Sequence, residues 1–230
     1  MKVGLLECDN VDGRFPQVKG GYREMFSALL PEAEFTYYKA HEGELPESAD
    51  ECAAWVCTGS QYGVYEDKPW IKDLGKFVRE LHQRKKPFVG ICFGHQMLAH
   101  ALGGTVAQAP QGWGVGVLPV EITHREAWME PARPEVRIQH MHADQVQKLP
   151  PGAVVLGRSA HCPVGMFRVG ETMLGIEGHP EFTAEFAEAL IRRRRERIGA
   201  ERSDAALKTV SSPTDGSLVG RWIARFLGAR

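Results

Sequence analysis

Short apolar runs, several of them continuous and β-branched, constrain the fold of this 230-residue chain more than any other feature. A strand with one face in water alternates apolar and polar residues, whereas a continuous run is typical of a strand covered on both faces. Helical stretches separate several of the runs. The runs are KVGLLE (2–7), EFTYY (34–38), AAWVC (53–57), PFVGI (87–91), VGVLPV (115–120), VRIQH (136–140), AVVLG (153–157) and MLGIEG (173–178).

The helical stretches indicate how these strands are connected. Residues 69–83 begin with proline and place five apolar residues on one helical face, and Thr183 can cap a second helix. Strand–helix alternation in the first half predicts a mostly parallel sheet flanked by helices. Between residues 105 and 177 strands follow one another with few helices, which predicts an antiparallel extension. We therefore expect an α/β fold in one domain over residues 1–230.

The C-terminal part has the weakest structural signal. Residues 199–216 carry little apolar pattern, so we expect a softer tail from about residue 199, with a final helix at 217–227. The basic run RRRRER (192–197) is interpreted as the solvated face of the helix after Thr183, with a docking surface as the alternative.

Composition excludes several classes of function. The chain is 43% hydrophobic and 25% charged, with a formal net charge of −1, which argues against a broad surface for nucleic acid or anionic membrane. No apolar run has the 18 or more residues of a membrane helix, and the first ten residues lack the apolar core of a signal peptide. The sequence leaves the oligomeric state open.

The cysteines argue against a disulfide framework and a metal site. The chain has five, an odd number, and none forms a CxxC pair, so free thiols in a reducing cytoplasm are expected. The nearest metal-like spacing is HMH at 140–142, which is not a recognisable ligand pattern. The GxG spacing in QGWGVG (111–116) precedes no helix, so we expect no dinucleotide and no other cofactor, only a turn near a pocket mouth.

One cysteine stands in an unusual place. In GICFG (90–94), Cys92 lies between two glycines, after an apolar strand and before a helix. Glycines permit a turn sharp enough to present a nucleophile at the carboxyl end of a strand, where α/β sheets bind ligands. The alternative is a buried, inert cysteine in a core turn.

Energetics indicate what a reactive thiol would need here. Lowering a thiol pKa from about 8.5 to about 6 takes roughly 3.4 kcal/mol. A helix N-terminus supplies only about 0.3–1 kcal/mol. A cation, most often a histidine, is therefore expected to supply the rest.

The most distinctive of nine histidines is His179, in GIEGHPEFT (175–183). Pro180 pushes the preceding residue toward extended backbone, in which residues two apart face the same side. Glu181 can therefore hold one imidazole nitrogen while the other faces a thiol. A surface turn with a solvated glutamate is the alternative for this segment alone.

Together, GICFGHQMLAHALGG (90–104) and GIEGHPEFT resemble the class I, or triad, glutamine amidotransferases in motif, order and separation. TGSQYGVYEDKPWI (58–71) and GWGVG (112–116) are most similar to stand-alone relatives of the glutaminase domain of GMP synthase, a group that includes γ-glutamyl peptidases. The resemblance covers about residues 1–190 and implies a flavodoxin-like fold.

The resemblance also implies roles for individual residues. Cys92 would attack the γ-carboxamide carbon to give a γ-glutamyl thioester and ammonia. His179 would move the protons, and Glu181 would hold its imidazole. The backbone N–H of Phe93 would bind the oxyanion.

A second oxyanion donor is expected in the turn after residues 53–57. Many relatives carry two adjacent glycines there, whereas this chain has Gly59 and Ser60, so either can be the donor.

Substrate binding is expected from Gln96, His142 and Asp144. Gln96 matches a family glutamine four residues after the nucleophile, and its alternative is a polar residue in the first helical turn. MHADQV (141–146) resembles the family's HxDxV segment beside the glutamine pocket. Asp144 can instead lead a short helix. Tyr65 and Glu66 can rim the site, and His95 is expected to cap or pack rather than react.

Three functions follow from these expectations. The first is a glutaminase that supplies ammonia to a separate synthetase, because the chain contains no ATP-binding phosphate loop. The second is an independent hydrolase of γ-glutamyl amides or peptides. The third, a binding module with a silent cysteine, is disfavoured by the intact Cys92, His179 and Glu181.

Overall fold

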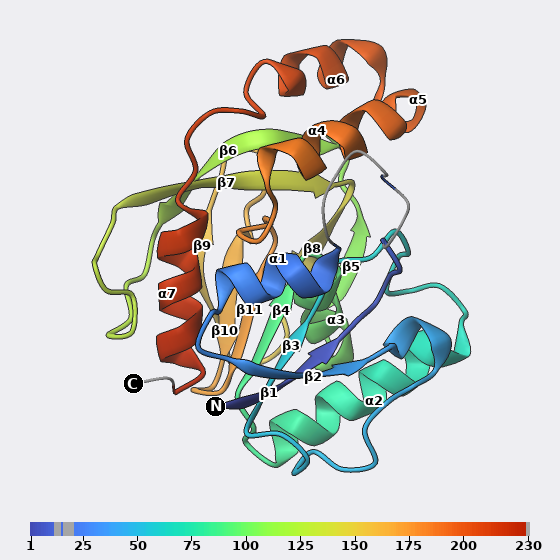
Figure 1. Cartoon of the computed structure of the whole chain (residues 1–230), viewed down its shortest axis with the longest axis vertical. Coiled ribbons are helices and arrows are strands. Elements are labelled where there is room, and N and C mark those ends of the chain that lie inside the picture. The colour runs from blue at the N-terminus through green and yellow to red at the C-terminus, as the bar shows by residue number, and fades with distance from the viewer. Residues whose placement is uncertain (12–14, 16–20, 229–230) are drawn as a thin grey trace.

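A nine-stranded mixed sheet forms the centre of the computed structural model, which describes residues 1–11, 15 and 21–228 (Figure 1). The strand order is β2-β1-β3-β4-β11-β10-β9-β6-β7, and a separate two-stranded sheet pairs β5 with β8. The strands are β1 (Lys2–Leu6), β2 (Glu34–Tyr38), β3 (Ala54–Cys57), β4 (Phe88–Ile91), β5 (Thr105–Gln108), β6 (Gly114–Ile122), β7 (Glu135–His142), β8 (Asp144–Lys148), β9 (Ala153–Arg158), β10 (Met166–Val169) and β11 (Met173–Ile176).

The two halves of the sheet differ in strand direction. Strands β2, β1, β3, β4 and β11 are parallel neighbours, and β10, β9, β6 and β7 continue the sheet with antiparallel pairing. The predicted α/β fold, a mostly parallel sheet with an antiparallel extension, is confirmed.

Helices cover both faces of the parallel half (Figure 1). The helices are α1 (Tyr22–Leu29), η1 (Ala40–Glu42), α2 (Pro69–Gln83), α3 (Phe93–Ala101), α4 (Ala184–Arg193), α5 (Arg195–Ile198), α6 (Ala200–Leu207) and α7 (Gly216–Phe226). One apolar cluster joins α1, α4 and α7 to the sheet, and a second joins α2 and α3 to its other face. Along β3, Ala54 and Val56 belong to the first cluster and Trp55 and Cys57 to the second, which explains the continuous apolar run.

The parallel arrangement determines where functional groups can gather. Strands β3, β4 and β11 are adjacent and parallel, so their carboxyl ends meet at one edge of the sheet. The residues that follow these strands include Gly59, Cys92 and His179. Open α/β sheets bind their ligands at this edge.

Several elements depart from the sequence-based expectations. Helix α1 and strands β5, β8 and β10 were not predicted, and Asp144 begins strand β8 rather than a short helix. The stretch expected to be soft contains α6, which packs on β6 through buried Ala206. Thr209 follows α6 and accepts a hydrogen bond from the Val117 backbone N–H (3.3 Å). Burial on the antiparallel extension therefore orders a segment of weak intrinsic pattern.

The predicted helices at 69–83 and after Thr183 are confirmed. Helix α2 begins with Pro69, and the Thr183 hydroxyl accepts a hydrogen bond from the Phe186 N–H (3.2 Å) at the start of α4. All five cysteines are free thiols. Among the described helices, none combines the length and apolar character needed to cross a membrane.

Candidate active site

Cys92 occupies a strained turn between β4 and α3. Its backbone has φ 51° and ψ −101°, a left-handed φ that side chains other than glycine rarely adopt. The Cys92 N–H donates to the Ile176 carbonyl (2.8 Å), and the Cys92 carbonyl accepts from the Gln96 N–H (2.9 Å). Strain of this kind is retained where surrounding contacts hold a residue in place, and it is common at functional sites.

The glycines on either side are needed because backbone approaches them closely. A Cβ on Gly90 would lie 2.2 Å from the Gly94 carbonyl oxygen, and one on Gly94 would lie 2.6 Å from the Cys57 carbonyl oxygen. Neither contact can be relieved by a side-chain rotation, since both carbonyl oxygens belong to the backbone. The tight turn inferred from the sequence is thus present at Cys92.

His179 is held in place from three sides. Its backbone N–H donates to the Gln139 carbonyl of β7 (2.7 Å), and its ring Nδ1 lies 2.7 Å from Oε1 of Glu181. The Phe182 ring stacks on the imidazole, with centroids 3.8 Å apart. His179 and Glu181 are both buried. Because a carboxylate accepts hydrogen bonds, Nδ1 carries the proton and Nε2 is the free, basic nitrogen.

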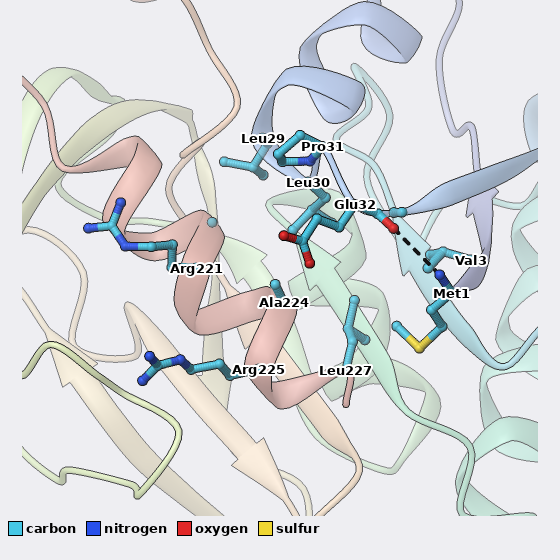
Figure 2. Close-up of a pocket in the computed structure, with 12 residues that line it drawn as sticks. Met1, Val3, Leu29, Leu30, Pro31, Glu32, Arg221, Ala224, Arg225 and Leu227 are labelled. Atoms are coloured by element: carbon cyan, nitrogen blue, oxygen red, sulfur yellow. Dashed lines mark hydrogen bonds between the residues drawn. The ribbon is translucent and has the colours of Figure 1, made fainter. Parts of the chain in front are cut away.

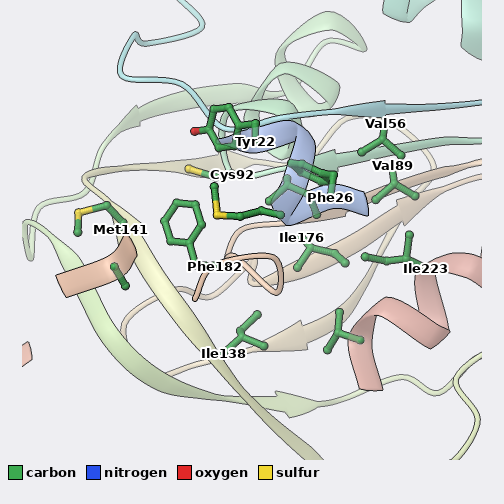
Figure 3. Close-up of a cluster of buried hydrophobic side chains, with 14 of the residues drawn as sticks. Tyr22, Phe26, Val56, Val89, Cys92, Ile138, Met141, Ile176, Phe182 and Ile223 are labelled. Carbon is green, nitrogen blue, oxygen red and sulfur yellow. The ribbon is translucent and has the colours of Figure 1, made fainter. Parts of the chain in front are cut away.

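The turn after β3 brings the imidazole and the thiol to one place. A Cβ on Gly59 would lie 2.9 Å from Cε1 of His179, 3.8 Å from Cβ of Cys92 and 3.2 Å from the Tyr22 hydroxyl. Cys92 also borders the large apolar cluster near Tyr22 and Phe182 (Figure 3). The grouping expected from the two sequence motifs is therefore present at the carboxyl edge of the sheet.

We predict that Gly59→Ala lowers activity by about 100-fold, because the added Cβ displaces the imidazole from the thiol. The measurement is kcat/KM for release of glutamate, together with the melting temperature. Gly75→Ala is the matched control, since its Cβ would meet the Met97 sulfur at 3.6 Å and Nη1 of Arg79 at 3.7 Å, both ordinary contacts. Equal kcat/KM values for the two variants would contradict the prediction.

A polar pocket of about 380 Å³ opens at this edge. It lies within the range of volumes typical of small-molecule sites. Its lining residues are Ser60, Gln61, Tyr62, Gly63, Tyr65, Glu66, Cys92, Phe93, Gln96, Gln108, Trp113, Met141, His142, Ala143, Asp144, Arg194 and Arg197. Tyr65, Glu66 and Trp113 thus lie at the pocket, as the sequence predicted for their segments.

Gln96 lines this pocket. Both hydrogen bonds of its amide nitrogen are to protein, to Oε1 of Glu177 (2.8 Å) and to the Asp144 carbonyl (3.0 Å). Within the described part of the chain, Oε1 of Gln96 accepts no hydrogen bond. The side chain is thereby oriented to accept one from a ligand.

His142 and Asp144 both line the pocket but differ in character. His142 is buried, and its Nδ1 donates to the Asp144 carbonyl (3.2 Å), which leaves Nε2 to accept from His140 (3.2 Å). Burial keeps the pKa of His142 well below its usual range, so the ring is neutral. The Asp144 carboxylate accepts from the Tyr65 hydroxyl (3.0 Å) and is the more accessible ligand group.

The backbone donors expected for an oxyanion lie beside the sulfur. The Phe93 N–H at the start of α3 lowers the pKa of the Cys92 thiol by hydrogen bonding to it. Over the described residues, the N–H groups of Gly59 and Ser60 make no hydrogen bond within the protein, so both remain candidates for the second donor.

Comparison with known proteins places this site in a family. The sequence model of the class-I glutamine amidotransferases matches residues 62–195, more than half of the chain. The chain is a class I glutamine amidotransferase. γ-Glutamyl peptidase 4 of Arabidopsis thaliana is 31% identical over 194 residues, covering 80% of this chain and 77% of the relative. The enzyme is accordingly an amide hydrolase by family.

Two further comparisons concern length and fold. GMP synthase of Thermomicrobium roseum is 32% identical over 204 residues, which cover 75% of this amidotransferase but only 36% of that protein. The crystal structure of a glutamine amidotransferase from Thermotoga maritima superposes with a TM-score of 0.81 at 22% identity, covering 99% of this chain and 98% of that one. The latter similarity concerns the fold.

The resting thiol of the amidotransferase differs from the expectation of a lowered pKa. Burial, followed by the carboxylates of Glu177 and Glu181, raises the pKa of Cys92 well above its usual range, and this outweighs the lowering by Arg194 and the Phe93 N–H. The resting cysteine is therefore a neutral thiol. A buried nucleophile of this kind needs a base at the moment of attack rather than a preformed charge.

Glu177 is a site residue that the sequence analysis missed. It is fully buried and lies two residues before His179, with Oε1 on the Gln96 amide and Oε2 3.4 Å from Nε2 of His95. Burial raises the pKa of Glu177 well above its usual range and lowers that of His95 to about 3. Both groups are neutral until Glu177 ionises, and its carboxylate then opposes ionisation of the Cys92 thiol. The period-two argument that selected Glu181 applies equally to Glu177 and was the available signal.

We predict that Glu177→Gln stabilises the amidotransferase increasingly as pH rises. Below the ordinary carboxyl pKa of 4.5, Glu177 is protonated in both folded and unfolded chains. Above it, the unfolded chain releases a proton that the folded protein retains, so the parent loses up to about 1 kcal/mol of stability per pH unit until the folded pKa is reached. Glutamine makes the same hydrogen bond without this cost.

Denaturant unfolding of parent and Glu177→Gln at pH 5, 6.5 and 8 measures this effect. The difference in unfolding free energy is expected to widen from pH 5 to pH 8. A difference that is the same at every pH would show that Glu177 is ionised in the folded protein.

A second cavity, of about 410 Å³, lies at the opposite end of β1, between the end of α1 and α7 (Figure 2). Its walls are mainly apolar, including Val3, Leu29 and Leu227, with Arg221 and Arg225 at the rim. None of the described residues that line it is a cysteine or a histidine. A cysteine does line the other pocket, at Cys92.

Proposed function

We propose that this protein hydrolyses the γ-amide bond of a γ-glutamyl compound, glutamine or a γ-glutamyl peptide, through a thioester on Cys92. The observation that carries the proposal is the 2.7 Å hydrogen bond between Nδ1 of His179 and Glu181, which leaves Nε2 free beside the Cys92 turn. A thiol, a base and an oriented carboxylate are the groups that acyl transfer requires.

The first half of the reaction forms the thioester. Nε2 of His179 takes the thiol proton as the sulfur attacks the γ-carbon, and the oxyanion accepts hydrogen bonds from the Phe93 N–H and from Gly59 or Ser60. The imidazolium then donates its proton to the leaving nitrogen while the C–N bond breaks. The products are a γ-glutamyl thioester and ammonia, or an amine when the substrate is a peptide.

The second half releases glutamate. His179 takes a proton from water, whose oxygen attacks the thioester carbon, and the C–S bond breaks as the thiol regains its proton. The glutamyl half would be held by the Gln96 carbonyl, which can accept from its ammonium, and by the Asp144 carboxylate beside His142. No cofactor enters any of these steps.

Of the two candidate functions, we favour the independent hydrolase. A γ-glutamyl peptidase is similar to this chain over most of its own length, and the pocket carries two arginines that ammonia as a leaving group would not use. Delivery of ammonia to a separate synthetase is the second candidate, supported by the similarity to GMP synthase over 36% of that protein.

A substrate screen of the purified chain distinguishes the two candidates. An independent hydrolase is expected to turn over a γ-glutamyl dipeptide panel without any partner. An ammonia-supplying subunit is expected to show weak glutaminase activity that rises when a synthetase subunit is added. Absence of glutamate release from every substrate, with and without the synthetase, would refute the proposed chemistry.

A further inference from the structure

The basic run at 192–197 is divided between solvent and the active-site pocket. Helix α4 ends at Arg193 and α5 starts at Arg195, so the chain turns at Arg194. Arg192 pairs with Glu188, and Arg195 pairs with Asp204, both on the exposed surface. Arg194, which is half-buried, and Arg197, which is exposed, line the pocket that contains Cys92.

Both of these pocket arginines lie beside the Trp113 ring. Their guanidinium carbons lie 6.0 and 5.7 Å from the Trp113 ring centroid, Arg194 and Arg197 respectively. In the described part of the chain, neither guanidinium forms an ion pair or a side-chain hydrogen bond. Burial lowers the pKa of Arg194 and outweighs the opposing effect of the nearby Asp9 carboxylate, so the guanidinium charge is partly withdrawn from water. Such a cation favours an anionic ligand.

The groups near Arg194 indicate on which side of the Cys92 sulfur it lies. Its charge acts on Cys92, Tyr22 and Asp9. The Tyr22 hydroxyl and Cε1 of His179 both approach the same point beside Gly59. The amide nitrogen of Gln96 instead donates to Glu177 and to the Asp144 carbonyl. Arg194 therefore lies toward the imidazole side of the sulfur.

The chemistry of amide cleavage assigns this side to the leaving group. The leaving nitrogen must receive a proton from His179, so whatever is attached to that nitrogen extends from the imidazole side. In glutamine nothing is attached. In a γ-glutamyl amino acid the next carbon carries a side chain and a carboxylate. Guanidinium groups bind carboxylates in a bidentate geometry.

Resting on the proposed function, we propose that Arg194 and Arg197 form a subsite for the carboxylate of the leaving amino acid, so that the preferred substrates are γ-glutamyl amino acids or peptides. The Trp113 ring packs against both guanidiniums and limits their freedom. Asp144 and Glu66 line the same pocket and are available to the glutamyl ammonium.

The test compares γ-glutamyl-alanine with γ-glutamyl-alaninamide, which share the scissile bond and differ only in the terminal carboxylate. The measured quantity is the ratio of their kcat/KM values, because it cancels any effect of Arg194 on the thiol. We expect the parent to prefer the acid by about 10- to 100-fold, and Arg194→Met and Arg197→Met each to lower that preference substantially. Arg192→Met, from the same run but ion-paired at the surface, should leave the ratio unchanged.

Three outcomes would overturn this inference. The first is a parent kcat/KM ratio near one. The second is that Arg194→Met and Arg197→Met lower kcat/KM for both substrates by the same factor, as they would if the arginines bound the glutamyl α-carboxylate. The third is that Arg192→Met changes the ratio as much as those two variants do. In each case Cys92→Ala still abolishes turnover, so the proposed function survives its failure.

Binding provides a readout that does not depend on turnover. Calorimetric titration of the Cys92→Ala protein should give a dissociation constant for γ-glutamyl-alanine about 10-fold or more below that for its amide, and Arg197→Met in that background should remove the difference. Equal affinities for acid and amide would refute the subsite even if the chain proves to have no hydrolase activity.

Discussion

Cys92→Ala is expected to lower kcat for glutamate release by about 10⁴-fold or more, for glutamine and γ-glutamyl peptides alike. Without the sulfur no thioester forms, and water must attack an unactivated amide. With glutamine, ammonia release and glutamate release should fall together, because ammonia leaves as the thioester forms and glutamate is released only from the thioester. The measurement is a coupled glutamate assay at saturating substrate.

The fold of this variant should remain intact. The methyl group of alanine can occupy the space of Cβ, and the turn depends on backbone contacts at Gly90 and Gly94 rather than on the sulfur. Cys162→Ala is the matched control, since Cys162 is also a buried free thiol but does not line the pocket. Release of ammonia by Cys92→Ala at the parent rate would remove the thiol from the mechanism.

His179→Asn is expected to lower kcat by about 10³- to 10⁴-fold. The variant has no group that takes the proton of a thiol whose pKa is already raised by burial and by two carboxylates. The loss should exceed that seen for enzymes with a preformed thiolate. The measurement is kcat at pH 7, with thermal unfolding to verify the fold.

Two comparisons refine this second prediction. His100→Asn is the control, because His100 is exposed in the last turn of α3. The double variant Cys92→Ala, His179→Asn should be no slower than Cys92→Ala alone, since groups that act as a unit are not additive. If the two losses multiply, the thiol and the imidazole do not act together.

Much of the site was accessible from local sequence pattern. GICFG predicts a sharp turn because only glycine tolerates the backbone contacts found at positions 90 and 94. HPE predicts an imidazole next to a carboxylate because extended backbone aligns residues two apart, and Glu181 lies 2.7 Å from His179. Such features depend on a few neighbouring residues and therefore survive in any tertiary context.

Features that depend on tertiary burial were not accessible in the same way. The pKa of the Cys92 thiol was expected to be lowered. Burial, Glu177 and Glu181 raise it instead, and an argument from the helix end alone does not include them. Strand β8 at Asp144 exists because β5 pairs with it, although its residues alternate weakly. Propensity is overridden there by pairing with a partner distant in sequence.

The basic run at 192–197 was predictable only in part. Phe186 and Leu190 are buried on α4, and Arg194 follows them at the same interval of four as the residue that ends this helix, so the period already pointed Arg194 away from solvent. What the sequence did not reveal is the break between α4 and α5 and the Trp113 ring that meets both arginines. Those contacts arise only when residue 113 and residues 194–197 meet at the pocket.

The most direct test of the central claim is mass-spectrometric mapping of the protein after reaction with a thiol-alkylating analogue of glutamine. We predict a single adduct on the peptide that contains Cys92, formed more slowly in the presence of excess glutamine and much more slowly in His179→Asn. An adduct on Cys57 or Cys162 instead, or labelling of Cys92 that neither glutamine nor loss of the imidazole slows, would contradict it.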